Sequence, residues 1–305
     1  MNLPSNITFI QRGWVNSNSI LISGGNGPVI VDTGHFLGTV ETLQLITENG
    51  VNPAEIKLIV NTHCHWDHLG ANAAIREMSG AQTAVSAATA HILQTNDRQA
   101  MWLDYFAADL IPIVIDLAWQ DGDVVQLGQY EFEVIATPGH APDSIALYQP
   151  DTRLLISADA LHENDCGILN TAVHGEQILD EAIETVHKLQ QRDIALALPG
   201  HGAPIMDAAG SLQTLANKLA RFKTHPEKMA LHLLRRVAMT TVLMQQPIHR
   251  DTLIEQALAR PWPHDYALRA GFNDPSHMLN HLLDSFIRRE LITEQEGILT
   301  SLVPR

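Results

Sequence analysis

Four candidate metal ligands stand within six consecutive residues of this chain. The stretch is His63-Cys64-His65-Trp66-Asp67-His68. Residues two apart in an extended segment point to the same side, so His63 and His65 can share one metal ion. A turn after them would direct Asp67 and His68 to a second position. Imidazole and carboxylate groups suit zinc, iron or manganese, and the stretch therefore predicts a metal site.

Three further candidate ligands each stand within four residues of the end of an apolar run that predicts a strand. They are His140, Asp159 and His201. The His-rich stretch likewise follows a predicted strand at 58–60. Loops at one edge of a rigid sheet are a common place for functional residues. We therefore expect these side chains to meet the His-rich stretch at one edge of the fold.

The order of these residues resembles the metallo-β-lactamase superfamily. The match comprises the H-x-H-x-D-H pattern, the later His, Asp and His, and the early segment Val31-Asp32-Thr33-Gly34. It covers about residues 1–210. The resemblance implies an αββα sandwich with two metal ions in a surface cleft. The ions would be zinc, with iron or manganese as alternatives.

The resemblance also implies a role for each ligand. The first metal ion would be bound by His63, His65 and His140, the second by Asp67, His68 and His201, with Asp159 bridging them. Two metal ions about 3.5–4 Å apart can share a hydroxide and polarise a carbonyl group. Asp67 would also orient that hydroxide, which makes it the expected catalytic residue. Asp32 would lie behind the ligands and position either a ligand histidine or the His-rich loop.

Other residues near the expected cleft are candidate substrate contacts. They are Trp102, Tyr105, Phe106, His35 and His162. The three aromatic residues belong to an insertion, 101–112, that also contains Leu110 and Ile111. The insertion would form a lid or channel wall for an apolar substrate, or a helix packed on the sandwich. The two histidines follow expected site loops and would reach the rim of the cleft, with structural roles as the alternative.

The composition excludes several classes of protein. The 305 residues carry 19 basic and 34 acidic side chains, a formal charge of −15, so we expect no nucleic-acid partner. No apolar run approaches the roughly 20 residues that span a bilayer, and we expect no membrane partner. The first residues do not indicate a signal peptide, and Cys64 and Cys166 are expected to be buried rather than paired. We expect a cytoplasmic protein and leave open whether it forms a homo-oligomer.

The elements that must position the site alternate between strands and helices as far as residue 224. Predicted hairpins turn at 24–28 and at Gly128, helices cover 39–49, 71–78 and 178–191, and further strands cover 154–156 and 195–198. This alternation predicts mixed sheets covered by helices, an α+β fold.

The pattern changes at His225-Pro226, after which helices dominate. Predicted helices at 229–245, 251–260 and 275–289, the last with Asp274 as its N-cap, and a hairpin around Gly297 resemble a winged-helix module. We therefore predict a metal domain at 1–224 and a small helical, winged-helix-like domain at 225–300. Residues 301–305 resemble the scar of an expression tag and are excluded from the fold.

The expected function is metal-dependent hydrolysis of a small acyl substrate of ester type, either a thioester or a lactone. Glyoxalase II-like thioesterases have a similar histidine motif and an added helical domain. Acyl-homoserine lactonases share the ligand set and use an apolar pocket, but no tyrosine follows Asp159 closely enough to match theirs. The alternatives are a nuclease or phosphodiesterase of the winged-helix-bearing β-lactamase-like group, and a ligand-binding or regulatory protein with little turnover.

Overall fold

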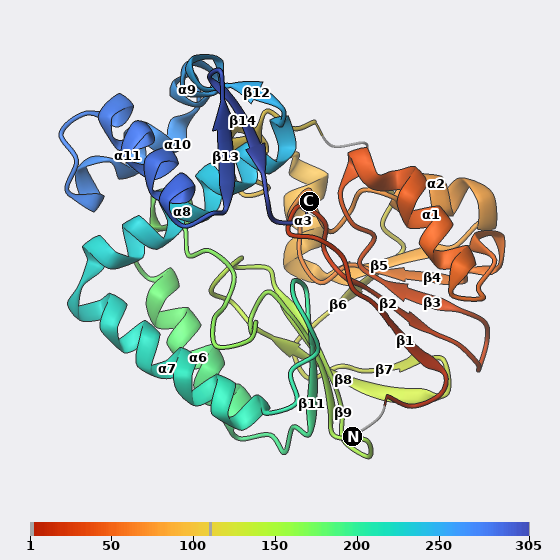
Figure 1. Cartoon of the computed structure of the whole chain (residues 1–305). Helices are drawn as coiled ribbons and strands as arrows, with labels where there is room; N and C mark the ends of the chain where they lie inside the picture. The colour runs from red at the N-terminus through yellow and green to blue at the C-terminus, as the bar shows by residue number, and fades with distance from the viewer. Residues whose placement is uncertain (1–2, 110–111, 305) are drawn as a thin grey trace.

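Two β-sheets lie face to face between layers of helices, and a further helical region covers one end of them (Figure 1). The computed structural model describes residues 3–109 and 112–304. Leu110 and Ile111 of the expected substrate wall, and Arg305, lie outside the described residues. The αββα sandwich predicted from the sequence is confirmed, together with a helical C-terminal region.

The first sheet has six strands in sequence order. They are β1 (Ile7–Ile10), β2 (Ser19–Ile22), β3 (Val29–Val31), β4 (Leu58–Val60), β5 (Gln82–Ser86) and β6 (Leu117–Trp119). The first three pair antiparallel, which confirms the predicted hairpin, and β3 to β6 pair parallel. Two helices, α1 (Thr39–Glu48) and α2 (Asn72–Ser79), connect the parallel strands, and α3 (Ala87–Thr95) follows β5. Apolar side chains such as Ile46 and Ile75 pack the first two helices on the outer face.

The second sheet has five strands in the order β11-β10-β9-β8-β7. They are β7 (Val124–Leu127), β8 (Tyr130–Ala136), β9 (Ile145–Gln149), β10 (Leu154–Ala158) and β11 (Leu196–Pro199). Only β11 runs parallel to its neighbour, because α6 (Ile178–Gln190) carries the chain across from β10. The next helix, α7 (Ala208–Thr224), lies beside α6 on the same outer face (Figure 1).

The main core lies between the sheets and follows the alternation of the strands. On β8, Phe132 and Val134 pack with the opposite sheet, whereas Ile135 packs beneath the helices of the outer face. Both faces of this strand are therefore covered. The packed sheets form a rigid base from whose edge the loops of the candidate site extend.

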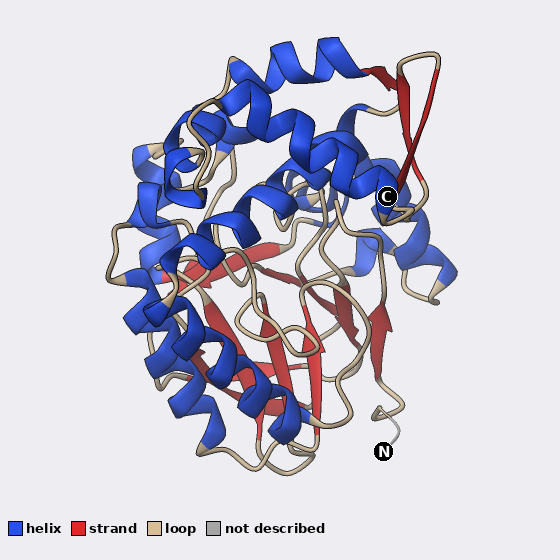
Figure 2. Cartoon of the chain, turned by 60° about the vertical axis from the view of Figure 1, so that its left-hand side comes forward, coloured by secondary structure: helices blue, strands red, loops and turns tan. Residues whose placement is uncertain are grey.

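The helical C-terminal region begins with α8, which a single residue, His225, separates from α7. Its elements are α8 (Pro226–Gln245), β12 (Ile248–His249), α9 (Arg250–Leu258), α10 (Pro261–Tyr266), α11 (Pro275–Arg288), β13 (Ile292–Gln295) and β14 (Ile298–Ser301). The three predicted helices and the hairpin are present, and α10 is an additional helix. Figure 2 shows these helices above the sheets. Whether residues 225–300 form a separate winged-helix-like domain stays a prediction.

The insertion after α3 and the chain end both pack against this region. Trp102 and Tyr105, on either side of the start of the short α4 (Leu103–Phe106), share an apolar cluster with α8, α10 and α11. Ser301 ends β14, and Val303 packs near Trp66. The exclusion of Ser301 and Val303 from the fold is therefore wrong, since Ser301 completes a hairpin and Val303 joins a packed cluster. Their origin as a tag scar stays a prediction.

No helix in the described ranges combines the length and the apolar character needed to cross a membrane.

Candidate metal centre

All seven predicted ligands meet where the strands of both sheets end. They form three overlapping groups whose ligand atoms lie within 4.8 Å of one another: His63, His65 and His140; His63, His68 and Asp159; Asp67, His68 and His201. The ligands thus come from the loops after β4, β8, β10 and β11. The expectation that these side chains gather at one edge of the fold is confirmed.

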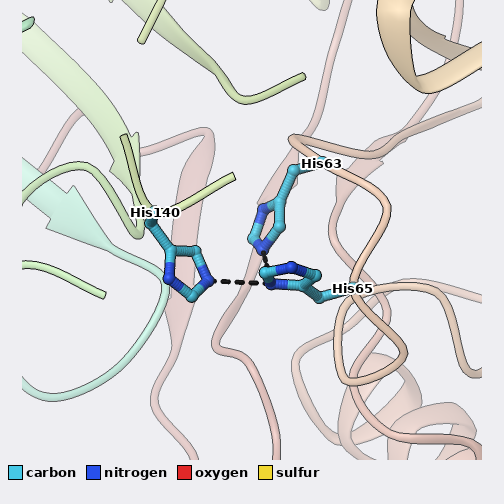
Figure 3. A group of neighbouring side chains, drawn as sticks. All are labelled: His63, His65 and His140. Carbon is cyan, nitrogen blue, oxygen red and sulfur yellow. Dashed lines mark hydrogen bonds between the residues drawn. The ribbon is translucent and has the colours of Figure 1, made fainter. Parts of the chain in front are cut away.

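Three imidazoles form the first group (Figure 3). His65 Nδ1 lies 3.1 Å from His63 Nε2 and 2.8 Å from His140 Nε2. All three side chains are buried. His140 Nδ1 lies 2.8 Å from the carbonyl oxygen of Ile168, a contact that leaves its Nε2 directed at the other two rings.

Asp159 lies between the group of His63, His65 and His140 and the group of Asp67, His68 and His201. Its Oδ2 is 3.3 Å from His140 Nε2 and 3.7 Å from His201 Nε2, and its Oδ1 is 3.7 Å from His68 Nε2. Asp67 Oδ2 is 3.3 Å from His201 Nε2. One carboxylate thus contacts ligands of both groups, which is the arrangement that a bridging ligand requires.

Asp32 orients His68 from behind. Its carboxylate accepts hydrogen bonds from the backbone N–H and the hydroxyl of Thr62, at 2.9 and 2.8 Å, and lies 2.8 Å from His68 Nδ1. Asp32 is buried and has a left-handed backbone conformation, with φ of 57°. The contact turns His68 Nε2 toward the ligand cluster, and Asp32 lies where the sequence analysis expects it.

Asp143 anchors the His-rich loop and was missed from the sequence. Its buried carboxylate accepts a 2.8 Å hydrogen bond from Cys64 N and a 2.6 Å bond from Thr89 Oγ1. Cys64 Sγ points toward Asp143, so the thiol faces away from the ligands. Both Cys64 and Cys166 are buried and free, as predicted. No local motif marks Asp143, whose importance depends on a contact with a distant loop.

Two glycines make room for the ligands. A side chain on Gly200 would begin 2.1 Å from Asp159 Oδ1, and one on Gly167 would begin 2.3 Å from the ring of His140. Neither substitution fits without moving a ligand. Gly167 was not singled out from the sequence, because the need for a glycine arises only from the approach of a loop to His140.

The protonation states suit metal binding. Burial lowers the pKa of His63 and His65 and lowers that of His140 to about 4, so these rings are neutral near pH 7 and have a lone pair to donate. Burial also acts against a charged His68, but Asp32 and the two carboxylates of the cluster outweigh it and raise its pKa to about 10. A cation at His68 Nε2 would displace that proton.

Some ligand atoms have no hydrogen-bond partner among the described residues. They are His68 Nε2 and Asp159 Oδ1, both buried. The nearby imidazoles outweigh the effect of burial and hold the pKa of Asp159 well below its usual value, so the carboxylate is ionised. Buried polar atoms without partners are costly, and a bound cation would satisfy both. The residues present therefore fit a metal centre of imidazole and carboxylate ligands.

A cavity of about 370 Å³ opens over the cluster. Asp67, Asp159 and three of the histidine ligands line one side, and helices α8 and α11 form the other. Of the expected substrate contacts, Trp102, Phe106 and His162 line this cavity. Trp66 lines it as well, and so does Trp14, which stacks on His201 with 6.1 Å between ring centroids and was missed from the sequence.

Tyr105 and His35 do not line the cavity, contrary to expectation. Tyr105 is buried against the C-terminal helices, and its hydroxyl donates a 2.8 Å hydrogen bond to Asp265. His35 is buried beneath the site loop, where its ring packs on Phe36 and Trp66. Both side chains support the walls of the site instead of reaching a substrate.

Comparison with known proteins agrees with this geometry. Over 191 residues the chain is 30% identical to a probable metallo-hydrolase of Methanocaldococcus jannaschii, which covers 61% of this chain and 88% of that protein. It is 33% identical over 146 residues to a hydroxyacylglutathione hydrolase of Cereibacter sphaeroides, covering 44% of this chain and 49% of that one. The alignment thus spans about half the length of the latter relative.

Solved structures show the same fold. A metallo-beta-lactamase family protein from Thermus thermophilus superposes with a TM-score of 0.61 at 18% identity, over 98% of this chain and 100% of the other. The model of the metallo-beta-lactamase superfamily matches residues 12–201, which include every predicted ligand. With that match and the ligand geometry together, the chain belongs to the metallo-beta-lactamase superfamily.

Proposed function

We propose that the protein is a metal-dependent hydrolase that cleaves a small ester-type substrate, a thioester or a lactone. The observation that carries the proposal is a complete set of imidazole and carboxylate ligands facing a cavity with aromatic and aliphatic walls. The likeness to a hydroxyacylglutathione hydrolase favours a thioester as the first substrate class to test.

Two divalent cations would be held by the seven ligands, with Asp159 between them. Bound there, they would supply Lewis-acid charge beside the carbonyl group and lower the pKa of water toward about 7. The protein's own residues fix the geometry. Asp32 and the carbonyl of Ile168 orient His68 and His140, and Asp67 presents a carboxylate oxygen at the mouth of the site.

The cavity walls favour an acyl substrate over a nucleic acid. Trp66, Trp102, Phe106 and Leu243 offer apolar surface that an acyl chain would cover. A polyanion would instead approach a protein with a formal charge of −15. A ligand-binding protein with little turnover is the second candidate, and turnover separates it from the first.

The test is a substrate panel on the purified, metal-loaded protein. We expect a thioester or lactone to be hydrolysed, and Asp67→Asn to abolish most of that turnover while the protein stays folded. Bis-p-nitrophenyl phosphate and a short RNA serve as the phosphodiester arm. Efficient RNA cleavage would replace the proposal with a nuclease, and binding without turnover of any member would favour the regulatory alternative.

A further inference from the structure

Three arginines line the cavity of this acidic protein. Arg235 and Arg236 lie on α8, and Arg289 directly follows α11. The acidic residues that line the same cavity are Asp67 and Asp159, both of which belong to the ligand cluster. The helical wall opposite the metal centre is therefore locally cationic, against the overall charge of −15.

Arg236 already has protein partners. Its guanidinium donates to the carboxylate of Asp165, which also accepts from Lys218, and it lies 5.5 Å from the ring centroid of Trp14. This arginine links α8 to the loop that carries Asp159. Its charge is compensated, and its role is structural.

Arg235 and Arg289 differ from Arg236 in this respect. Both side chains are exposed, and neither makes an ion pair or a side-chain hydrogen bond with any residue that the structure describes. A guanidinium group binds carboxylate or phosphate oxygens through paired hydrogen bonds and keeps its charge at any physiological pH. Two such groups beside an apolar wall suit an anionic ligand.

The residues of α8 that line the cavity change in character along the helix. Arg236 lies over the ring of Trp14, which stacks on His201, so the part of α8 that carries Arg235 and Arg236 lies near that ligand. Leu243 lies seven residues further along the helix, about 10 Å at 1.5 Å per residue. It packs in the cluster that contains Trp66. The face of α8 that lines the cavity therefore has arginines near its middle and the apolar Leu243 toward its end.

We propose that this cavity selects an acyl substrate whose leaving group carries an anionic carboxylate or phosphate, bound by Arg235 and Arg289. The acyl chain would extend toward Leu243 and Trp66, and the bond to be cleaved would lie over the ligand cluster. This inference rests on the proposed hydrolysis of an ester-type substrate and names the class of leaving group.

The test compares matched thioesters that share an octanoyl chain. One pair carries 3-mercaptopropionate or its neutral amide as the leaving thiol, and a second pair carries phosphopantetheine or pantetheine. We expect kcat/KM to favour the anionic member of at least one pair about tenfold, as one charge-assisted hydrogen bond would give. The pair that shows the larger preference distinguishes carboxylate from phosphate.

The variants Arg235→Gln and Arg289→Gln should each reduce this preference several-fold, through a higher KM for the anionic thioester. Arg288→Gln is the matched control, because Arg288 is exposed at the end of α11 and does not line the cavity. The preference should also decrease with added salt. Equal kcat/KM within both pairs, or equal losses in the control, would overturn the inference while leaving the hydrolase proposal intact.

A binding measurement separates the two proposals. Calorimetry with the free thiols alone should show that the anionic thiol binds more tightly than its neutral partner. Arg235→Gln should weaken the binding of the anionic thiol only. If no thioester or lactone is turned over, the proposed function fails, and this binding difference still decides the inference. Equal affinity for charged and neutral thiols would contradict it.

Discussion

The two sides of the cavity are built in opposite ways. On the sandwich side, the seven ligands are buried or nearly so, and Asp32, Thr62 and Asp143 hold His68 and the His-rich loop through hydrogen bonds. On the helical side, α8 and α11 present apolar residues and exposed arginines with few fixed contacts. From this contrast we infer a division of roles: the first side would hold the metal ions, and the second would contact the substrate.

Loss of the bridging carboxylate should give the largest effect. Asp159→Asn keeps the shape of the side chain but removes the charge that faces both ligand groups. We expect metal content to fall at both positions and kcat/KM to fall by at least about a hundredfold. Elemental analysis beside kinetics checks this. Full metal content with full activity would show that the sandwich side does not depend on Asp159.

Removal of the residue behind a ligand should have a smaller effect. Asp32→Asn weakens the contact that orients His68, and we expect metal affinity to fall by about 10–100-fold. Competition with a chelator measures the affinity. Asp180→Asn, at an exposed position on α6, is the control. Equal affinities of the two variants would contradict a positioning role for Asp32.

The contacts that connect the sandwich to the C-terminal helices should contribute chiefly to the stability of the fold. Asp165, from the loop after β10, accepts from Lys218 of α7 and contacts Arg236 and His232 of α8. Asp165→Asn removes this partly buried charge, and we expect a loss of about 2 kcal/mol in the free energy of unfolding. Chemical denaturation provides the value. An unchanged midpoint would mean that the sandwich and the helices are joined elsewhere.

The lowered pKa of Asp165 also predicts that the stability of the protein depends on pH. Burial raises the pKa of Asp165, but His232, Arg236 and Lys218 outweigh burial and hold the pKa below its usual 3.8. Its stabilising effect is therefore complete above about pH 4 and is lost as the pH falls toward the lower pKa of the folded state. Below about pH 4, the free energy of unfolding should decrease less steeply with falling pH in Asp165→Asn than in the wild type. Parallel curves for the two proteins would refute this assignment.

The smallest effect concerns the apolar wall. Each CH₂ group buried contributes about 0.8 kcal/mol, so kcat/KM should rise by up to about fifteenfold for every two carbons between C2 and C10 thioesters until the cavity is full. Phe106→Ala should flatten this trend, because Phe106 lines the cavity. Tyr105→Phe is the control, since Tyr105 lies outside it. A trend that both variants preserve would place the acyl chain elsewhere.

Trp102 is unsuitable for that test because it supports the metal centre. Its ring centroid lies 4.4 Å from that of His65, and its Nε1 donates a 3.1 Å hydrogen bond to His174. Its backbone has a left-handed conformation, with φ of 57°. A change at Trp102 would therefore disturb both sides of the cavity together.

The sandwich side was largely predictable from the sequence. Its ligands are concentrated in one short stretch and at three strand ends, and the order of residue types is enough to bring them together. The residues that support the ligands were harder to predict from the sequence. Asp143 and Gly167 carry no motif, and their roles depend on loops that meet only in three dimensions.

The helical side was not predictable to the same extent. Its helices were predicted from the sequence, but the sequence does not specify which face of α8 turns toward the metal centre. Arg235 and Arg289 are 54 positions apart and acquire significance only because both line one cavity. Tyr105 was misassigned for the same reason, since an aromatic insertion can line a cavity or pack behind it.

We infer that the seven ligands hold two metal ions and that hydrolysis requires both. Stepwise addition of zinc to the metal-free protein, with metal content and thioester hydrolysis measured on the same samples, tests it most directly. We predict that the metal-free protein is inactive and that hydrolysis reaches its maximum at two metal ions per chain. Full hydrolysis without metal, or saturation of metal content at one ion per chain, would contradict the account.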